Sequence, residues 1–179
     1  MACVFTTSFD YNACKGGAGG IKRVLIIEAA NVSAFALTAN VITGITRVST
    51  KIFREWKLDK EMGYAKSPLA GDQKTDNIIY NHEVGFSIKK FTTTVAAEIK
   101  LLAQNWMIMI VEDRNGKYRA YGLGTTYEKS NFMNLDAGGD GTGTAMTDMN
   151  GFDNLVFTSK EDNFAYEVDS TIIAALLVP

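Results

Sequence analysis

Residues 78–89 read IIYNHEVGFSIK, a stretch that predicts a β-strand. Apolar and polar residues alternate here, so that Tyr80, Val84 and Phe86 fall on one face, and His82 shares that face. Alternation over this length is typical of a β-strand with one side buried. Because His82 lies among apolar neighbours, we interpret it as a packed, hydrogen-bonded histidine rather than as a metal ligand or a base.

The segment that follows this strand predicts a short helix that packs against a sheet. The threonines at 92–94 offer N-caps, and Glu98 is expected to complete a capping box. One helical face is apolar, since an i, i+4, i+7 spacing relates Val95, Ile99 and Leu102.

Short strands are expected on both sides of this pair. An apolar strand on each side of Asn115-Gly116 predicts a hairpin, because this dipeptide supplies the positive φ angles of a tight turn. Further strands are expected at 21–28, 41–48, 51–58, 107–111, 117–123 and 152–159. The predicted fold class is therefore mainly β (a β-sandwich or small barrel) with one flanking α-helix.

Three segments lack the pattern of a strand or helix. Residues 1–20 end in KGGAGG and predict a flexible N-terminal arm. Residues 59–77 are polar without a period and are expected to form a long loop. Residues 131–147, rich in Gly, Asp and Thr, are expected to be a flexible loop. The chain is thus divided into the arm and a single β-rich domain, residues 21–179.

Composition excludes several classes of protein. The 179 residues are 46% hydrophobic and 21% charged, which is ordinary for a globular domain and unlike a disordered chain. No run of about 18 apolar residues predicts a transmembrane helix, and the N-terminus does not have the pattern of a signal peptide. A single histidine excludes a metal site made of two or three histidines.

The sulfur and carboxyl groups offer only weak candidates for chemistry. Cys3 and Cys14 are expected to be reduced thiols, with a bridge between them as the less favoured alternative, and a Cys nucleophile would need His82 as its partner. The acids near the C-terminus lie in hydrophilic turns, where we expect them to ionise normally rather than act as paired glycosidase carboxylates.

The glycine runs do not predict a nucleotide site. The run at 16–20 precedes a strand instead of following one, and no Gly-Lys-Ser/Thr triple is present. A calcium site that uses Asp136, Asp140 and Asp148 is a minor alternative. We therefore predict no enzyme activity and no catalytic, cofactor-binding or metal-binding residues.

Charge is distributed unevenly along the chain. Residues 1–60 carry eight bases against four acids, whereas residues 131–179 carry one base against eight acids. This asymmetry indicates either complementary surfaces or an ordinary solvated exterior. The basic part lacks a dense Lys/Arg cluster, so specific nucleic-acid binding is not favoured.

The order of features across residues 78–177 carries a resemblance. A strand leads into a single helix, and an apolar strand then ends in DRNGK at 113–117, followed by YGLG at 121–124. A Gly-rich loop, DMNG at 148–151 and FDNLVF at 152–157 complete the series. This order resembles the tail tube proteins of tailed bacteriophages and, more loosely, the inner-tube proteins of contractile injection systems.

The resemblance implies a structural virion protein that is made in the bacterial host cytoplasm and has no membrane association. Six copies would form a ring, rings would stack head to tail, and DNA would pass through the lumen without sequence-specific contact. Other tail or neck proteins of the phage would be its further partners. Residues 59–77 would be the loop between rings, and residues 1–20 would be an arm.

Two other functions remain open from the sequence. The first is a neck or connector ring of a short-tailed phage, which would use the same fold. The second is a soluble carbohydrate-binding β-sandwich module, which would present aromatic side chains on one exposed face. We favour a core role for the ten aromatic residues in the expected strands and their flanks, which are Phe53, Trp56, Phe86, Phe91, Trp106, Tyr118, Tyr121, Phe152, Phe157 and Tyr166.

Overall fold

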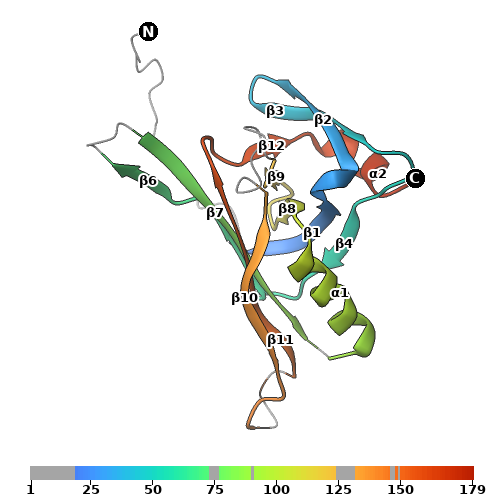
Figure 1. The fold of residues 1–179 in the computed structure, drawn as a ribbon, viewed down its shortest axis with the longest axis vertical. Helices are drawn as coiled ribbons and strands as arrows, with labels where there is room; N and C mark the ends of the chain where they lie inside the picture. Colours follow the sequence, from blue (N-terminus) through green and yellow to red (C-terminus); the bar gives the residue numbers. More distant parts are fainter. Residues whose placement is uncertain (1–18, 73–76, 90, 124–131, 146–147, 149) are drawn as a thin grey trace.

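Two β-sheets pack face to face in the computed structural model, with helix α1 (Thr93–Gln104) beside them (Figure 1). The structure describes residues 19–72, 77–89, 91–123, 132–145, 148 and 150–179. The predicted fold class, a mainly β protein with a flanking helix, is confirmed. No helix among the described residues has the length and apolar character needed to cross a membrane.

The first sheet has seven strands, and it includes the first and the last strand of the described chain. Its strands are β1 (Ile21–Glu28), β2 (Val32–Thr38), β3 (Val41–Arg47), β4 (Arg54–Lys57), β8 (Met107–Asp113), β9 (Tyr118–Tyr121) and β12 (Tyr166–Val168). They are ordered β2-β3-β12-β9-β8-β1-β4, and only β12 and β3 run parallel. A short 3₁₀ turn, η1 (Ala29–Asn31), connects β1 to β2.

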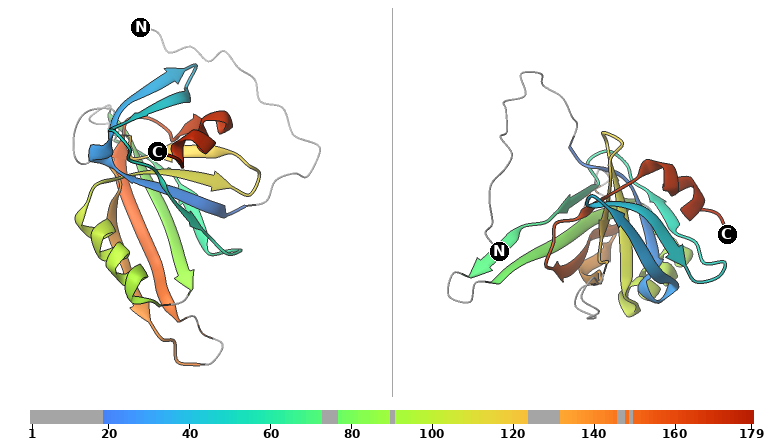
Figure 2. Two further views of the ribbon diagram at one scale, coloured as in Figure 1. Left: turned by 90° about the vertical axis from the view of Figure 1, so that its right-hand side faces the viewer. Right: turned by 90° about the horizontal axis from the view of Figure 1, so that it is seen from above.

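The second sheet is built around one long strand. Its members are β5 (Gly63–Lys66), β6 (Leu69–Asp72), β7 (Asn77–Lys89), β10 (Asn134–Gly141) and β11 (Gly151–Glu161). The order is β10-β11-β7-β5, and β6 pairs with β7 beyond the end of β5. Figure 2 shows β7, β10 and β11 running side by side past the body of the molecule.

The central strands β1 and β8 are buried on both faces. Val24, Ile26 and Met109 face the second sheet and form one apolar core with Val84 and Phe86 of β7. Their neighbours Leu25, Ile27, Ile108 and Ile110 form a second core on the other side of the sheet, beneath Phe53 and helix α2 (Ser170–Leu176). This double burial explains why β1 and β8 are continuous apolar runs rather than alternating ones.

The segment expected as a long loop, residues 59–77, contains two short strands, and this part of the prediction is wrong. β5 and β6 pair antiparallel with successive parts of the same side of β7. Pro68 separates them, since proline has no N–H to donate to a ladder, while its carbonyl accepts from the N–H of Asn81 at 2.9 Å. Two four-residue strands are too short to show a clear period.

The prediction for the glycine-rich segment 131–147 is also corrected, because eight of its residues form the edge strand β10. It pairs with β11 from Asn134 opposite Thr158 to Gly141 opposite Gly151, with two register shifts. Glycine has low strand propensity, so the ladder with β11 rather than local sequence determines this strand. The predicted N-terminal arm, residues 1–20, lies almost wholly outside the described residues.

The predicted helix is confirmed, although its capping differs in one detail. Thr92 caps α1 by accepting from the N–H of Val95, and Ile99 and Leu102 are buried as the spacing requires. Glu98 stands six residues after this cap and therefore cannot complete a capping box, which needs an acid three residues after it. The C-terminal helix α2 and the strand β2 were not anticipated.

The predicted Asn-Gly hairpin is also present, between β8 and β9. Asp113 Oδ1 accepts from the backbone N–H groups of Asn115 at 2.8 Å and Lys117 at 2.9 Å, and Gly116 has φ +77°. Gly122, just after β9, has φ +75°, but its surroundings are crowded: a Cβ there would lie 2.6 Å from the backbone N of Met133.

These two glycines give a matched test of the fold. Gly116→Ala meets nothing within 4 Å, so it should cost only about 1 kcal/mol, the penalty of a left-handed backbone. Gly122→Ala adds a clash with backbone and should lose about 1–3 kcal/mol more. Urea denaturation of both variants measures the difference. Equal stability losses would contradict the close packing of residue 122 against Met133.

Candidate functional site

The described residues contain one buried pair of ionisable side chains, His82 on β7 and Glu161 at the end of β11. His82 is 1% exposed and Glu161 is 3% exposed. Oε1 of Glu161 accepts hydrogen bonds from the backbone N–H groups of Gly122 at 2.7 Å and Leu123 at 3.0 Å. The pair therefore fastens the end of β9 to the second sheet.

The hydrogen bonds of His82 determine where its proton lies. Nε2 is 2.9 Å from the carbonyl oxygen of Asn163, and a carbonyl only accepts, so Nε2 is the donor. Nδ1 then faces Oε1 of Glu161 at 3.7 Å and makes no hydrogen bond within the described residues. A bare ring nitrogen facing a carboxylate is unfavourable, so protonation of Glu161 relieves the repulsion between them.

Burial is the main cause of the shifted ionisation of both groups. Desolvation raises the pKa of Glu161 to about 7, against the lowering effect of the N–H donors of Leu123 and Gly122. Burial also lowers the pKa of His82, although its bond to Asn163 opposes that shift. Both directions favour the neutral forms, with the proton on Glu161 below neutral pH.

Both side chains of this pair are buried, so a substrate in solution does not reach them. The interpretation of His82 as a packed, hydrogen-bonded histidine is confirmed, and the ring of Tyr121 lies edge-on to it at 5.4 Å. Cys3 and Cys14, its candidate thiol partners, lie outside the described residues. The sequence could not reveal Glu161 as a buried acid, since the N–H groups that bind it come from residues almost 40 positions earlier.

The acids weighed as calcium ligands are arranged as ordinary strand and loop residues. Asp136 and Asp140 are exposed on β10. Asp148 accepts from the N–H groups of Thr144 at 2.7 Å and Ala145 at 2.8 Å, and these bonds lower its pKa. Within the described part of the chain, no three His, Cys, Asp or Glu side chains are grouped so that they could hold a metal ion.

A network of charges on the first sheet ties four of its strands together. Arg23 of β1 binds Glu55 of β4 and Glu112 of β8, and it donates to the hydroxyl of Tyr118 on β9 at 2.7 Å. Lys22 also pairs with Glu112 at 2.8 Å, so that the buried carboxylate is compensated. Lys22 and Arg23, two of the bases in residues 1–60, are therefore paired inside the subunit.

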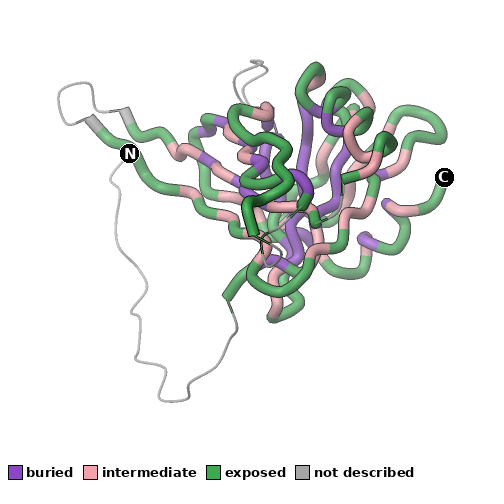
Figure 3. Tube along the Cα trace, turned by 90° about the horizontal axis from the view of Figure 1, so that it is seen from below, coloured by how far each residue is buried: buried purple, intermediate pink, exposed green. Residues whose placement is uncertain are grey.

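An apolar surface lies on the hairpin formed by β6 and β7, which projects from the body (Figure 1). We define the hairpin patch as Leu69 and Ile78 of the hairpin together with Phe164 beside it, whose exposed fractions are 57%, 57% and 60%. Tyr80, next to this patch, packs its ring on Phe164 at a centroid distance of 4.1 Å. Figure 3 shows the exposed and half-buried course of the hairpin beyond the buried core.

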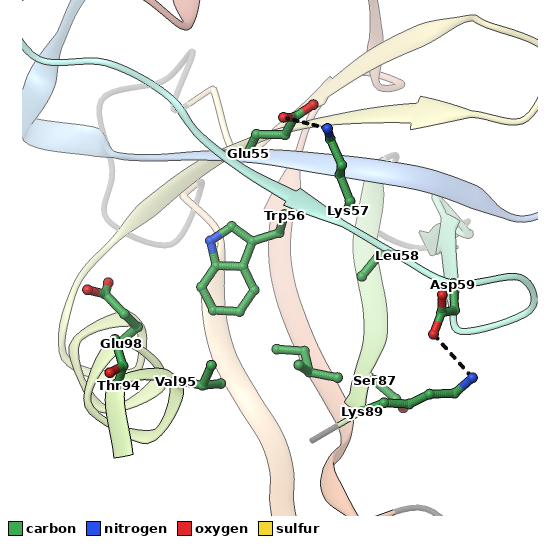
Figure 4. A pocket seen from close by; sticks show the side chains of 11 residues that line it. Glu55, Trp56, Lys57, Leu58, Asp59, Ser87, Lys89, Thr94, Val95 and Glu98 are labelled. Atoms are coloured by element: carbon green, nitrogen blue, oxygen red, sulfur yellow. Dashed lines mark ion pairs between the residues drawn. The ribbon is translucent and has the colours of Figure 1, made fainter. Parts of the chain in front are cut away.

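A second apolar feature is a groove between α1, β4 and the opposite end of β7. We define the helix groove by its half-buried apolar floor, Trp56, Leu58, Ile88 and Val95 (Figure 4). Its volume is about 310 Å³, at the lower end of the range for ligand pockets. The rim is charged and includes Lys89, which pairs with Asp59 at 3.1 Å.

The aromatic residues mostly build the interior. Six of the ten expected as core residues are buried, namely Phe53, Phe86, Tyr118, Tyr121, Phe152 and Phe157. Trp56 and Tyr166 are half-buried, and only Phe91 and Trp106 are exposed, at 47% and 39%. These two flank opposite ends of α1, and the ring of Phe91 stacks on Phe152 at 5.4 Å.

The buried acid predicts a pH-dependent stability that Glu161→Gln should remove. Because folding raises the pKa of Glu161 from 4.5 to about 7, its favourable contribution is complete below about pH 4.5 and is lost as the pH rises through 7. The loss is on the order of 3 kcal/mol. Glutamine keeps an acceptor for Gly122 and Leu123 and supplies a donor toward His82.

Denaturant titrations of the wild type and Glu161→Gln at pH 5, 6, 7 and 8 measure this effect. The variant should gain stability relative to the wild type as the pH rises. Since both proteins keep His82, whose lowered pKa acts in the opposite direction, the difference between them isolates Glu161. A difference that stays constant from pH 5 to 8 would show that Glu161 is ionised normally.

No family model, curated protein or solved structure matches this chain.

Proposed function

We propose that this chain is a structural protein of a bacteriophage particle, a tail tube or tube-like ring subunit. Its copies assemble into hexameric rings around a channel for DNA, and the chain carries out no catalysis. The proposal combines the order of sequence features with a two-sheet β fold flanked by one helix. Under this proposal the chain acts through contacts between its copies and has no reactive site.

The observation that carries this proposal is the hairpin patch. Leu69, Ile78 and Phe164 each expose more than half of their surface, although the chain has two well-packed cores that could take apolar side chains. The exposed side chains of the projecting hairpin do not pack in either core. Contiguous exposed apolar surface on a protein of this kind favours a contact with another molecule.

Two alternatives differ from this proposal in what they require. A neck or connector ring would use the same surfaces, and only the form of the assembly separates it from a tube. A carbohydrate-binding module would need aromatic side chains grouped on an open face. The two exposed aromatic residues near α1 flank opposite ends of the helix, and the larger apolar patch is mainly aliphatic, which favours protein contacts.

Self-assembly of the purified chain is the first expected outcome. Electron microscopy and light scattering should show rings of six 19.6 kDa chains, or stacked tubes, at high protein concentration. Because the proposed contact is apolar, added salt should preserve or strengthen the assembly. Closed single rings without tubes would favour the connector alternative. A chain that stays monomeric at every concentration and salt level, or that binds glycans as a monomer, would contradict the proposal.

A matched pair of variants tests whether the hairpin patch matters for this assembly. Leu69→Asp should raise the concentration needed for assembly at least tenfold, because it places a charge on the contact. Leu101→Asp is the control, since Leu101 is 50% exposed on α1 but belongs to neither the hairpin patch nor the helix groove. Light scattering at a series of concentrations measures both. An equal effect of the two substitutions would contradict a specific role for the hairpin.

A further inference from the structure

The apolar face of β7 is longer than the core that covers it. Along this face, His82, Val84 and Phe86 are buried at 0–2% exposure. Ile78, on the same face, is 57% exposed, and Ile88 at the other end is half-buried on the floor of the helix groove. One strand therefore has an unfilled apolar surface at each end.

The first end belongs to the hairpin patch. Leu69 lies opposite Tyr80, and Gly71 lies opposite Ile78. Residues directly opposite in an antiparallel pair point to the same side of a sheet, so Leu69 and Ile78 share the face that continues into the core. Residues 69–71 and 78–81 include no charged side chain. This end of the face is thus apolar, uncharged and raised above the body.

At the second end of β7 the apolar face does not project and instead lines the helix groove. Trp56 of β4, Ile88 of β7 and Val95 of α1 line this groove together. Figure 4 shows Trp56 and Val95 coming from different elements toward the same space. The ring of Trp56 contacts Phe86 edge-on at 6.1 Å, which joins the groove to the core. Among the charges at the rim, Asp59 and Lys89 pair with each other at 3.1 Å, and Glu55 pairs with Arg23 and Lys57. An apolar side chain entering the groove leaves these charges paired, and Glu98 of α1 is exposed at the edge.

These two surfaces cannot meet within one subunit. Ten residues separate Ile78 from Ile88, which corresponds to roughly 33 Å along an extended strand. Figure 1 places the β6–β7 hairpin and α1 at opposite ends of β7. A projecting apolar element and an apolar hollow at opposite ends of one chain are the two halves of a head-to-tail contact, and such a contact is heterologous.

We propose that the hairpin patch of one copy docks in the helix groove of the next copy, with Ile78 and Leu69 against Trp56, Ile88 and Val95. The inference rests on the proposed self-assembly and names the surfaces that make it. The occupant is a second copy of this chain because each copy carries both an apolar projection, whose residues 69–71 and 78–81 include no charge, and an apolar floor that complements it. A chain of such contacts runs in the direction of β7.

Disulfide cross-linking tests which surfaces meet. In a background with Cys3→Ser and Cys14→Ser, Ile78→Cys and Val95→Cys are placed on separate copies and mixed under mild oxidation. A cross-linked dimer should form at least tenfold faster than with Leu101→Cys in place of Val95→Cys. Leu101 is the control because it lies on the same helix but outside the groove. Equal rates for the two positions would overturn the assignment of the groove.

A mixing experiment tests the head-to-tail geometry. Ile78→Asp disables the hairpin and Val95→Asp disables the groove, so each variant alone should be at least tenfold weaker in assembly. Mixed together, the two retain one intact contact per pair and should form 1:1 complexes. Far-ultraviolet circular dichroism and melting show that each variant is folded, and the cross-linking result stands even where Val95→Asp unfolds.

The outcomes separate this inference from the function on which it rests. A wild-type chain that never assembles would overturn both. A wild-type chain that assembles, together with variants that assemble equally well or a mixture that forms no pairs, would overturn the docking inference alone. In that case the ring subunit proposal would stand, and the contact would lie on other surfaces.

Discussion

The structure depends on the packing of one face of β7 against the first sheet. β7 has 13 residues, and it pairs with β11 on one side and with β5 and β6 on the other. Val84 and Phe86 lie where the two sheets overlap, and they pack in the same core as Val24 and Met109. Without this contact the second sheet would keep only the cover of α1, whose Ile99 and Leu102 belong to the same core.

The limit of that overlap explains the placement of both polar and apolar features. His82 and Glu161 lie near the margin of the core, where backbone N–H groups at the end of β9 remain to be satisfied. Beyond this margin, the same face continues as the hairpin patch, and at the opposite end it opens into the helix groove. Because β7 is longer than the core that covers it, the buried pair of His82 and Glu161 lies near the margin of the core, and an uncovered apolar surface lies at each end of the strand.

The sequence predicts those parts of this arrangement that local pattern determines. The alternation in 78–89 identifies β7, the spacing of Val95, Ile99 and Leu102 identifies the buried face of α1, and Asn115-Gly116 identifies a turn. β10 has too many glycines to show a strand, and Pro68 divides β5 from β6. The state of Glu161 and the helix groove depend on residues distant in sequence, so no local pattern could indicate them.

The two ends of β7 are proposed as contact surfaces for another copy of the chain. Hydrogen–deuterium exchange at low and high protein concentration tests this directly. The account predicts slow exchange at residues 84–86 at every concentration. It also predicts protection that rises with concentration in the β6–β7 hairpin and in the first turns of α1, with little change in β2 and β3. Exchange that is independent of concentration at both ends of β7 in assembled protein would contradict it.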